Sequence, residues 1–181
     1  MLFRSELVRE LLIELGEDPE REGILKTPMR VAKSLEFLTS GYRKELKTVI
    51  NEAVFQAESN SMIIARDIEV YSMCEHHMLP FFGRCHVGYI AKDKVLGLSK
   101  LARTVEIIAR RPQQQERLTR EIREAIESHL DPSGVLVMVE ATHSCMQIRG
   151  AKAHGAVMRT RSVGGRWEDR KSTRLNSSHA N

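Results

Sequence analysis

The sequence predicts an α+β fold in which N-terminal helices precede two strands, two helices and two more strands. Three observations support this order. Apolar residues recur at helical spacing in four segments, β-branched and aromatic residues concentrate in four others, and turns rich in Gly, Pro or Asp separate them. A chain of 181 residues can bury one substantial core, so a second globular domain is not required.

Residues 1–50 are expected to form a helical N-terminal region. The first helix covers residues 5–15 and stops at Gly16, and its apolar stripe consists of Leu7, Val8, Leu11, Leu12 and Leu15. Thr27 is expected to cap a second helix, with Pro28 at the first helical position. This second helix then presents Val31, Leu35 and Leu38.

A hairpin and two helices are expected next. Met62–Tyr71 and Arg84–Ile90 are rich in strand-forming residues and could pair with each other. Ser99 opens a helix that runs to about Arg110, and Pro112 interrupts it. A second apolar stripe then continues to about Leu130 through Leu118, Ile122, Ala125 and Ile126.

Two further strands complete the unit. Asp131–Gly134 is a strong turn signal, Val135–Ala141 has the character of a buried strand, and Ala156–Val163 could be its partner. We therefore assign residues 51–165 to one domain and residues 166–181 to a C-terminal tail. The polar end of this tail, after Arg174, is typical of a linker or a readthrough product rather than of a folded domain.

Two short segments gather thiols and imidazoles at the ends of predicted strands. They are Cys74–His77 and His143–Met146. Cys74 and His77 form a Cys-x-x-His pair, and Cys145 can supply a second sulfur from a distant segment. Structural zinc usually takes four protein ligands, but catalytic zinc takes three and leaves one position for water or substrate. The count of three favours a catalytic zinc site.

The alternative is a structural zinc clip, which needs a fourth protein ligand such as His76, His143 or Cys85. Cys85 alternates with Val87 and Tyr89, so period-two patterning places it on one face of a strand. We interpret Cys85 as a core residue. A plain hydrophobic role for all these cysteines is disfavoured because they occur together with histidines.

Other polar groups suggest an anion site and a base-reading site. Ser99-Lys100 and Arg103 place a hydroxyl and two cations at a helix N-terminus, where anions bind favourably, and Arg149 follows Cys145 by four residues. The carboxylate and amide of Gln115-Glu116 could read the donor edge of a purine. For each group taken singly, the simpler interpretation is a solvated surface charge.

Composition indicates the cellular compartment and the classes of partner to expect. Three cysteines at sparse spacing argue against a secreted disulfide framework and for a reducing compartment. We expect a cytoplasmic protein with no membrane partner, because no segment approaches the ~20 apolar residues of a membrane span. The formal charge is +4, half of it in the tail, and no long basic run with interleaved aromatics is present, so nucleic acid is not the expected partner.

Seven motifs in one order and spacing carry a family resemblance. The chain resembles GTP cyclohydrolase I from about Leu11 to Trp167, through Gly16-Glu17-Asp18-Pro19, Arg21-Glu22-Gly23, Thr27-Pro28-Met29-Arg30-Val31-Ala32-Lys33, Cys74-Glu75-His76-His77, Gly97-Leu98-Ser99-Lys100, Gln115-Glu116-Arg117-Leu118-Thr119 and His143-Ser144-Cys145-Met146 with Arg149-Gly150. The resemblance implies the tunnelling fold, whose ββααββ unit packs two helices on one face of an antiparallel sheet. It also implies a toroidal homodecamer with substrate sites between subunits.

The resemblance further implies a reaction and its residues. GTP would lose C8 of its imidazole ring as formate and be rearranged to 7,8-dihydroneopterin triphosphate, the first step of tetrahydrofolate and pterin biosynthesis. The implied residues are Cys74, His77 and Cys145 for Zn²⁺; His76 and His143 for proton transfer; Gln115 and Glu116 for guanine; and Ser99, Lys100, Arg103, Arg149 and a neighbouring subunit's Arg30 for the triphosphate. The nitrile reductase of queuosine biosynthesis shares the fold, but it uses a cysteine nucleophile with a nicotinamide cofactor and lacks the zinc triad.

Overall fold

The computed structural model describes residues 2–51, 53–58 and 61–167. The chain divides into two compact units, Met1–Ser40 and Gly41–Asn181, each of which is described by itself. Most of the tail expected over residues 166–181 lies outside the described residues. Among the helices that are described, none combines the length and apolar character needed to cross a bilayer.

The first unit contains the two expected helices, α1 (Leu2–Glu14) and α2 (Thr27–Leu38). One detail of the prediction is wrong, because Thr27 is the first helical residue and Lys26 is the N-cap. A run of turns over the preceding residues leads directly into the helix: Thr27 N–H donates to Ile24 O at 2.7 Å, and Lys26 is already in the α region. Thr27 therefore has no capping role.

The second unit begins before its sheet. After the 3-10 turn η1 (Ser40–Arg43), the Gly41 N–H donates to Arg110 O at 3.0 Å. The short helix α3 (Leu46–Asn51) follows, and its Ile50 is fully buried in the main core. These contacts belong to the unit that contains the main sheet.

The expected ββααββ order is present. The first three of its strands are longer than the sequence predicts, and the fourth is shifted by two residues toward the C-terminus. The main sheet has the order β5-β2-β3-β6-β7. Its strands are β2 (Met62–Cys74), β3 (Pro80–Ile90), β5 (Pro112–Gln113), β6 (Gly134–His143) and β7 (Met158–Gly165). All neighbours are antiparallel except β5, which pairs with β2 in parallel. Two short strands, β1 (Val54–Gln56) and β4 (Lys94–Leu96), form a separate ribbon.

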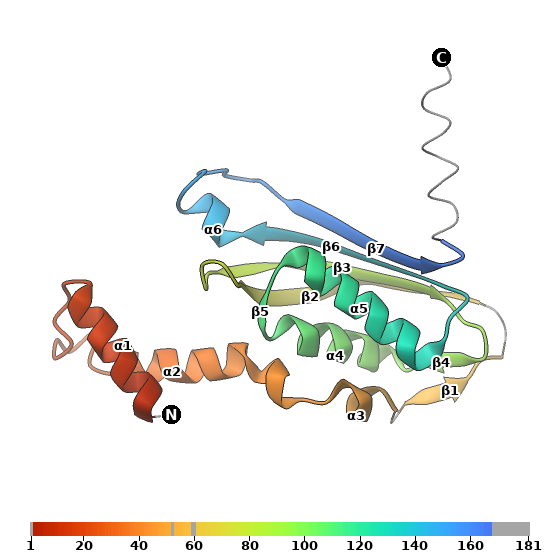
Figure 1. Ribbon diagram of the computed structural model, residues 1–181, viewed down its shortest axis with the longest axis horizontal. Coiled ribbons are helices and arrows are strands. Elements are labelled where there is room, and N and C mark those ends of the chain that lie inside the picture. The colour runs from red at the N-terminus through yellow and green to blue at the C-terminus, as the bar shows by residue number, and fades with distance from the viewer. Residues whose placement is uncertain (1, 52, 59–60, 168–181) are drawn as a thin grey trace, which may run out of the picture. The chain divides into compact units, whose positions relative to one another are not determined.

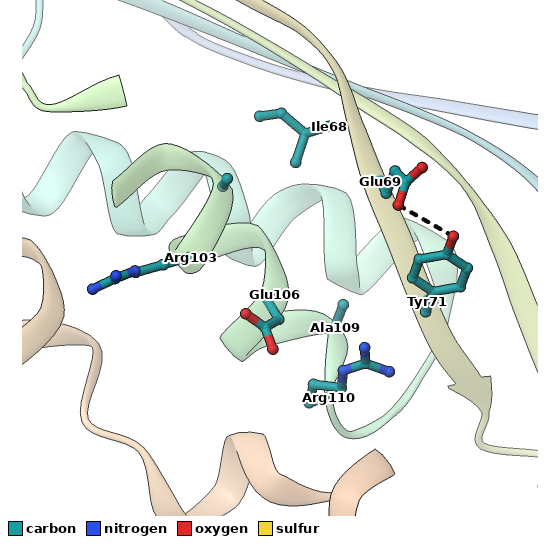
Figure 2. Close-up of a pocket in the computed structure, with 8 residues that line it drawn as sticks. Ile68, Glu69, Tyr71, Arg103, Glu106, Ala109 and Arg110 are labelled. Carbon is teal, nitrogen blue, oxygen red and sulfur yellow. Dashed lines mark hydrogen bonds between the residues drawn. The ribbon is translucent and has the colours of Figure 1, made fainter. Parts of the chain in front are cut away.

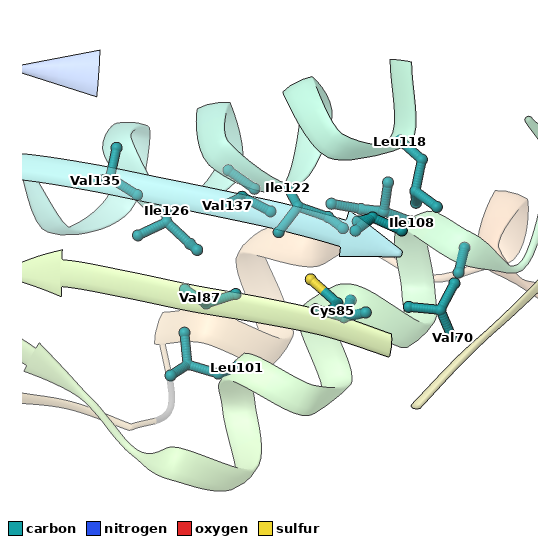
Figure 3. Packing of buried hydrophobic residues seen from close by; sticks show 14 of the residues in the cluster. Val70, Cys85, Val87, Leu101, Ile108, Leu118, Ile122, Ile126, Val135 and Val137 are labelled. Atoms are coloured by element: carbon teal, nitrogen blue, oxygen red, sulfur yellow. The ribbon is translucent and has the colours of Figure 1, made fainter. Parts of the chain in front are cut away.

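Two helices, α4 (Leu98–Ala109) and α5 (Gln115–Leu130), pack beside each other along one face of the main sheet (Figure 1). The core lies between these helices and the strands, and Figure 3 shows Leu101, Ile122 and Ile126 facing Cys85 and Val137. Cys85 is fully buried, as expected for a core residue, and burial raises the pKa of its thiol to about 12.

Candidate active site

Strand ends bring the two ligand segments together at one end of the main sheet. Cys74 is the last residue of β2, and its register partner is Gln113 in β5. His143 is the last residue of β6 and lies opposite Phe81 of β3. The one-turn helix α6 (Ser144–Gln147) follows at once and carries Cys145. Segments almost seventy residues apart in the sequence thus meet at this edge (Figure 1).

Cys74, His77 and Cys145 form a group that could hold a metal ion, because their ligand atoms all lie within 4.8 Å of one another. Cys74 Sγ is 3.7 Å from His77 Nδ1. Tetrahedral zinc with bonds of about 2.0–2.3 Å holds sulfur and nitrogen ligands roughly 3.6 Å apart, so the spacing fits zinc. Burial, and secondarily the neighbouring Cys74, raises the pKa of Cys145, and a bound cation would offset this.

A tight turn explains how two nearby residues face one ion. The Cys74 N–H donates to Leu79 O, and the Met78 N–H donates back to Cys74 O, both at 2.8 Å. Met78 takes a left-handed conformation with φ of 54°, which reverses the chain between β2 and β3. The turn exposes the imidazole of His77 and keeps Cys74 buried at the sheet.

His143 lies beside the metal group but is not one of its three members. Its ring stacks on Phe81, with centroids 4.4 Å apart and planes 10° apart. Its Nε2 is 2.8 Å from Gln115 Oε1. Burial lowers the pKa of His143, and the charge of Glu116 opposes this shift. These contacts favour a neutral imidazole in a fixed orientation.

His76 flanks the group on the other side. Its Nδ1 is 3.8 Å from Cys74 Sγ, and its Nε2 is 3.3 Å from Gln114 Nε2. The side chain is otherwise exposed to solvent. Both ring nitrogens therefore lie within reach of groups at the site, and the ring remains accessible to a substrate.

The two residues expected to read guanine have different surroundings. Gln115 is 2% exposed, and its amide Nε2 donates to Val139 O and Met158 O at 3.0 Å and to Thr160 Oγ1 at 3.1 Å. Because Gln115 Oε1 also contacts His143, the whole amide is engaged within the chain. Glu116 is exposed and lines a hollow of about 360 Å³ between α5 and β7, together with Arg120, Arg123, Thr160, Arg161, Ser162 and Val163.

The predicted triphosphate residues are not all brought together. The positive charge of Arg149 lowers the pKa of Cys145, against the larger effect of burial, so Arg149 lies near the metal group. Ser99 and Lys100 stand at the start of α4, whereas the metal group lies near the opposite end of this helix. The strand β5 begins soon after α4 ends, and it pairs with Cys74. A helical rise of 1.5 Å per residue separates Ser99 from the end of α4 by ~15 Å. Lys100 is also 8% exposed.

Arg103 lies outside the metal group as well. It lines a hollow of about 270 Å³ between α4 and β2 with Glu69, Tyr71, Glu106 and Arg110 among its walls. Figure 2 shows its side chain extending away from Glu69 and Tyr71. Arg30 belongs to the first unit and lies on α2.

Sequence reasoning missed Gln113, Gln114 and Arg117, which contact the Cys74–His77 segment from β5 and the start of α5. Gln113 O accepts the Glu75 N–H at 3.1 Å, and Arg117 pairs with the Glu75 carboxylate. Arg117 does stand in one of the family motifs, but nothing in its local pattern distinguishes it from a surface arginine.

Comparison with known proteins identifies the family. A family model described as GTP cyclohydrolase I matches residues 4–180. GTP cyclohydrolase 1 of Dictyostelium discoideum is 55% identical over 167 residues, covering 92% of this chain and 72% of that protein. The protein of the same name from Methylococcus capsulatus is 52% identical over 168 residues, covering 93% and 91% of the two chains.

A solved structure supports the fold. The crystal structure of the archaeosine synthase QueF-Like in the apo form matches with a TM-score of 0.51 and 18% identity, over 60% of this chain and 97% of that chain. At this identity the likeness concerns the fold alone, and it confirms the expected tunnelling fold. With a family model matched over nearly its whole length and relatives more than half identical to it, the chain belongs to the GTP cyclohydrolase I family.

Proposed function

We propose that this protein is a zinc-dependent hydrolase that opens the imidazole ring of GTP, releases C8 as formate and forms 7,8-dihydroneopterin triphosphate. The observation that carries the proposal is the three-ligand group of Cys74, His77 and Cys145 with two further imidazoles beside it. Three protein ligands leave a coordination position open, as in catalytic zinc sites. Zinc bound there would supply Lewis-acid activation of water for attack at C8.

His143 is suited to proton transfer. Because Gln115 Nε2 faces three oxygen acceptors, Gln115 Oε1 faces His143 and accepts a hydrogen bond from its Nε2–H. Neutral His143 then carries its proton on Nε2 and offers the lone pair of Nδ1 as a base. Its lowered pKa keeps this form populated near neutral pH. His76, exposed on the other side of the group, is the second proton carrier.

Glu116 is the residue that best suits recognition of guanine. Its carboxylate is exposed at a hollow of about 360 Å³ and can accept hydrogen bonds from N1–H and the exocyclic amine. Adenine offers no such edge. Gln115 contributes indirectly, by fixing the start of α5 beside His143, since its amide is engaged within the chain.

We further propose that the site is completed by a neighbouring subunit in a homo-oligomer, which the family resemblance suggests is a decamer. Ser99 and Lys100 stand ~15 Å from the C-terminal end of α4, which precedes the strand β5 paired with Cys74. These two residues are therefore poorly placed to bind the same substrate as the metal ligands of their own chain. A second copy could present its α4 start or its Arg30 to the metal group of the first. Closed rings of identical subunits commonly form such shared sites.

A reducing compartment such as the cytoplasm suits this chemistry, because a metal site with two thiolate ligands requires reduced cysteines. The reductase alternative needs a free nucleophilic cysteine. Cys85 is buried with a pKa of about 12, and the other two cysteines belong to the metal group. None of the three cysteines is therefore well suited to act as a nucleophile on a nitrile.

The direct test is to incubate purified, zinc-loaded protein with GTP and to measure formate together with a fluorescent pterin after oxidation. Cys145→Ser, prepared in the same way, is the control for contaminating activity. Equal amounts of formate and pterin from the wild-type protein alone support the proposal. Absence of both products from a zinc-loaded, assembled protein overturns it.

A further inference from the structure

One short segment contacts both halves of the metal group. Residues 112–117 include β5 and the first turn of α5. Within it, Gln114 contacts His76, Gln115 contacts His143, and Arg117 pairs with Glu75. The segment thus reaches the Cys74–His77 turn and the end of β6 at the same time, although it supplies no metal ligand.

Arg117 links the first turn of α5 to the Cys74–His77 turn. Its Nη2 donates to the Glu75 carboxylate and, at 3.0 Å, to Pro112 O, and its Nε donates to Gln113 Oε1 at 2.8 Å. Glu75 stands directly after the ligand Cys74 and two residues before the ligand His77. The guanidinium therefore contacts the metal-ligand segment through a single side chain, that of Glu75.

The partners of Arg117 are themselves held in place. Gln113 is 1% exposed, and its Nε2 donates to Ile108 O at 3.1 Å and to Glu121 Oε2 at 3.0 Å. The Gln113 carbonyl accepts the Glu75 N–H at 3.1 Å, so the ligand turn is tied to β5 through its backbone as well. Arg117 and Glu75 have side-chain exposures of 32% and 27%, which shields their ion pair partly from solvent.

We propose that Arg117 is a positioning residue that holds the Cys74–His77 turn through Glu75 and thereby sets the affinity of the site for its metal. The inference rests on the proposed zinc site and adds a residue outside the ligand set. The turn reverses the chain through the left-handed Met78 and is exposed at His77. The Arg117–Glu75 pair is a side-chain link from this turn to the first turn of α5, beside the contact of Gln114 with His76. Partners that orient first-sphere ligands typically change metal affinity ~10- to 100-fold when removed.

The experiment compares Arg117→Met, Glu75→Gln and the double variant with the wild-type assembled protein. Arg120→Met is the matched control, because Arg120 lies on the same helix and pairs with Glu124 at 3.7 Å in a largely exposed ion pair. Zinc affinity is measured by competition with a chromophoric chelator. The visible absorption of the cobalt-substituted proteins reports the ligand geometry, and the melting temperature of each metal-free protein reports stability separately.

We expect Arg117→Met and Glu75→Gln each to weaken zinc binding ~10- to 100-fold and to alter the cobalt spectrum, and the double variant to be no weaker than either single variant. Arg120→Met should bind zinc as the wild type does. Arg117→Lys should recover only part of the affinity, because an ammonium cannot replace the guanidinium fork.

Two outcomes would overturn the inference. Unchanged zinc affinity and an unchanged cobalt spectrum in both single variants would show that the pair does not position the turn. Lower melting temperatures of the metal-free proteins with unchanged affinity would assign Arg117 a structural role only. A wild-type protein that binds no zinc would instead reject the proposed function, so the two failures are distinguishable.

Discussion

Gln115 Oε1 lies 2.8 Å from His143 Nε2, and this contact couples the first turn of α5 to the last residue of β6. The opposite end of the amide donates to carbonyl oxygens of β6 and β7. The amide therefore cannot rotate without losing several hydrogen bonds, and the orientation of the His143 ring is determined by residues outside the metal group.

Replacing Gln115 with Leu should lower kcat ~10-fold or more and leave the zinc content unchanged, because His143 loses the acceptor that selects its tautomer. Steady-state kinetics and metal analysis measure both quantities. Gln115→Glu is the companion variant, since it keeps an acceptor for Nε2–H. A raised KM for GTP with an unchanged kcat would instead show that Gln115 contributes to binding of guanine.

Removing either flanking imidazole should separate chemistry from metal binding. His143→Ala and His76→Ala are expected to retain stoichiometric zinc and to lose activity by ~10²- to 10⁴-fold, the usual contribution of a general acid or base. Metal content and turnover are measured on the same preparations. If one variant loses its zinc, that histidine is a ligand and its proposed role is wrong.

Cys145→Ser should lose metal and activity together, because Cys145 is the ligand that comes from the second segment. The fold should remain, since Val87, Ile122, Val137 and their neighbours form the main core, and Cys145 is only a partly buried residue packed against it. Circular dichroism and metal analysis test the two statements separately. Full activity of a metal-free protein would refute the zinc assignment.

Glu116→Ala should weaken binding of GTP far more than it changes zinc content. A guanine that enters the altered site loses the hydrogen bonds from N1–H and the exocyclic amine to the carboxylate, each worth about 1.5–3 kcal/mol. Equilibrium binding of GTP to the variant gives the measurement. Wild-type affinity for GTP would place the base-reading role elsewhere.

Mixing two inactive variants tests whether sites are shared. Arg30→Ala and Cys145→Ser should each be nearly inactive. In equal mixtures that are dissociated and reassembled, roughly a quarter of the sites should combine an intact Arg30 from one subunit with intact zinc ligands from its neighbour, by random statistics in a closed ring. Activity should reappear to that extent. A mixture that co-assembles and stays inactive would show that Arg30 does not act across subunits.

Long periodic segments were predictable, and very short ones were not. The stripes that form α4 and α5, the alternation in β3 and the apolar run in β6 each extend over several residues, so these elements are visible in the sequence. The strand β5 has two residues and exists because Cys74 and Gln113 pair across the sheet. No local pattern predicts such an element, because its partner lies far away in the sequence.

The sequence by itself determined the order of the long helices and strands, the family and the chemical types that gather at the site, since all of these follow from residue identity and spacing. Tertiary structure alone decided that Gln115 faces His143, that Arg117 holds Glu75, and that Ser99 stands at the far end of α4 from Cys74. The physical reason is that hydrogen bonds and ion pairs depend on distances between side chains in space, which are set by how the helices cross the sheet and not by spacing along the chain.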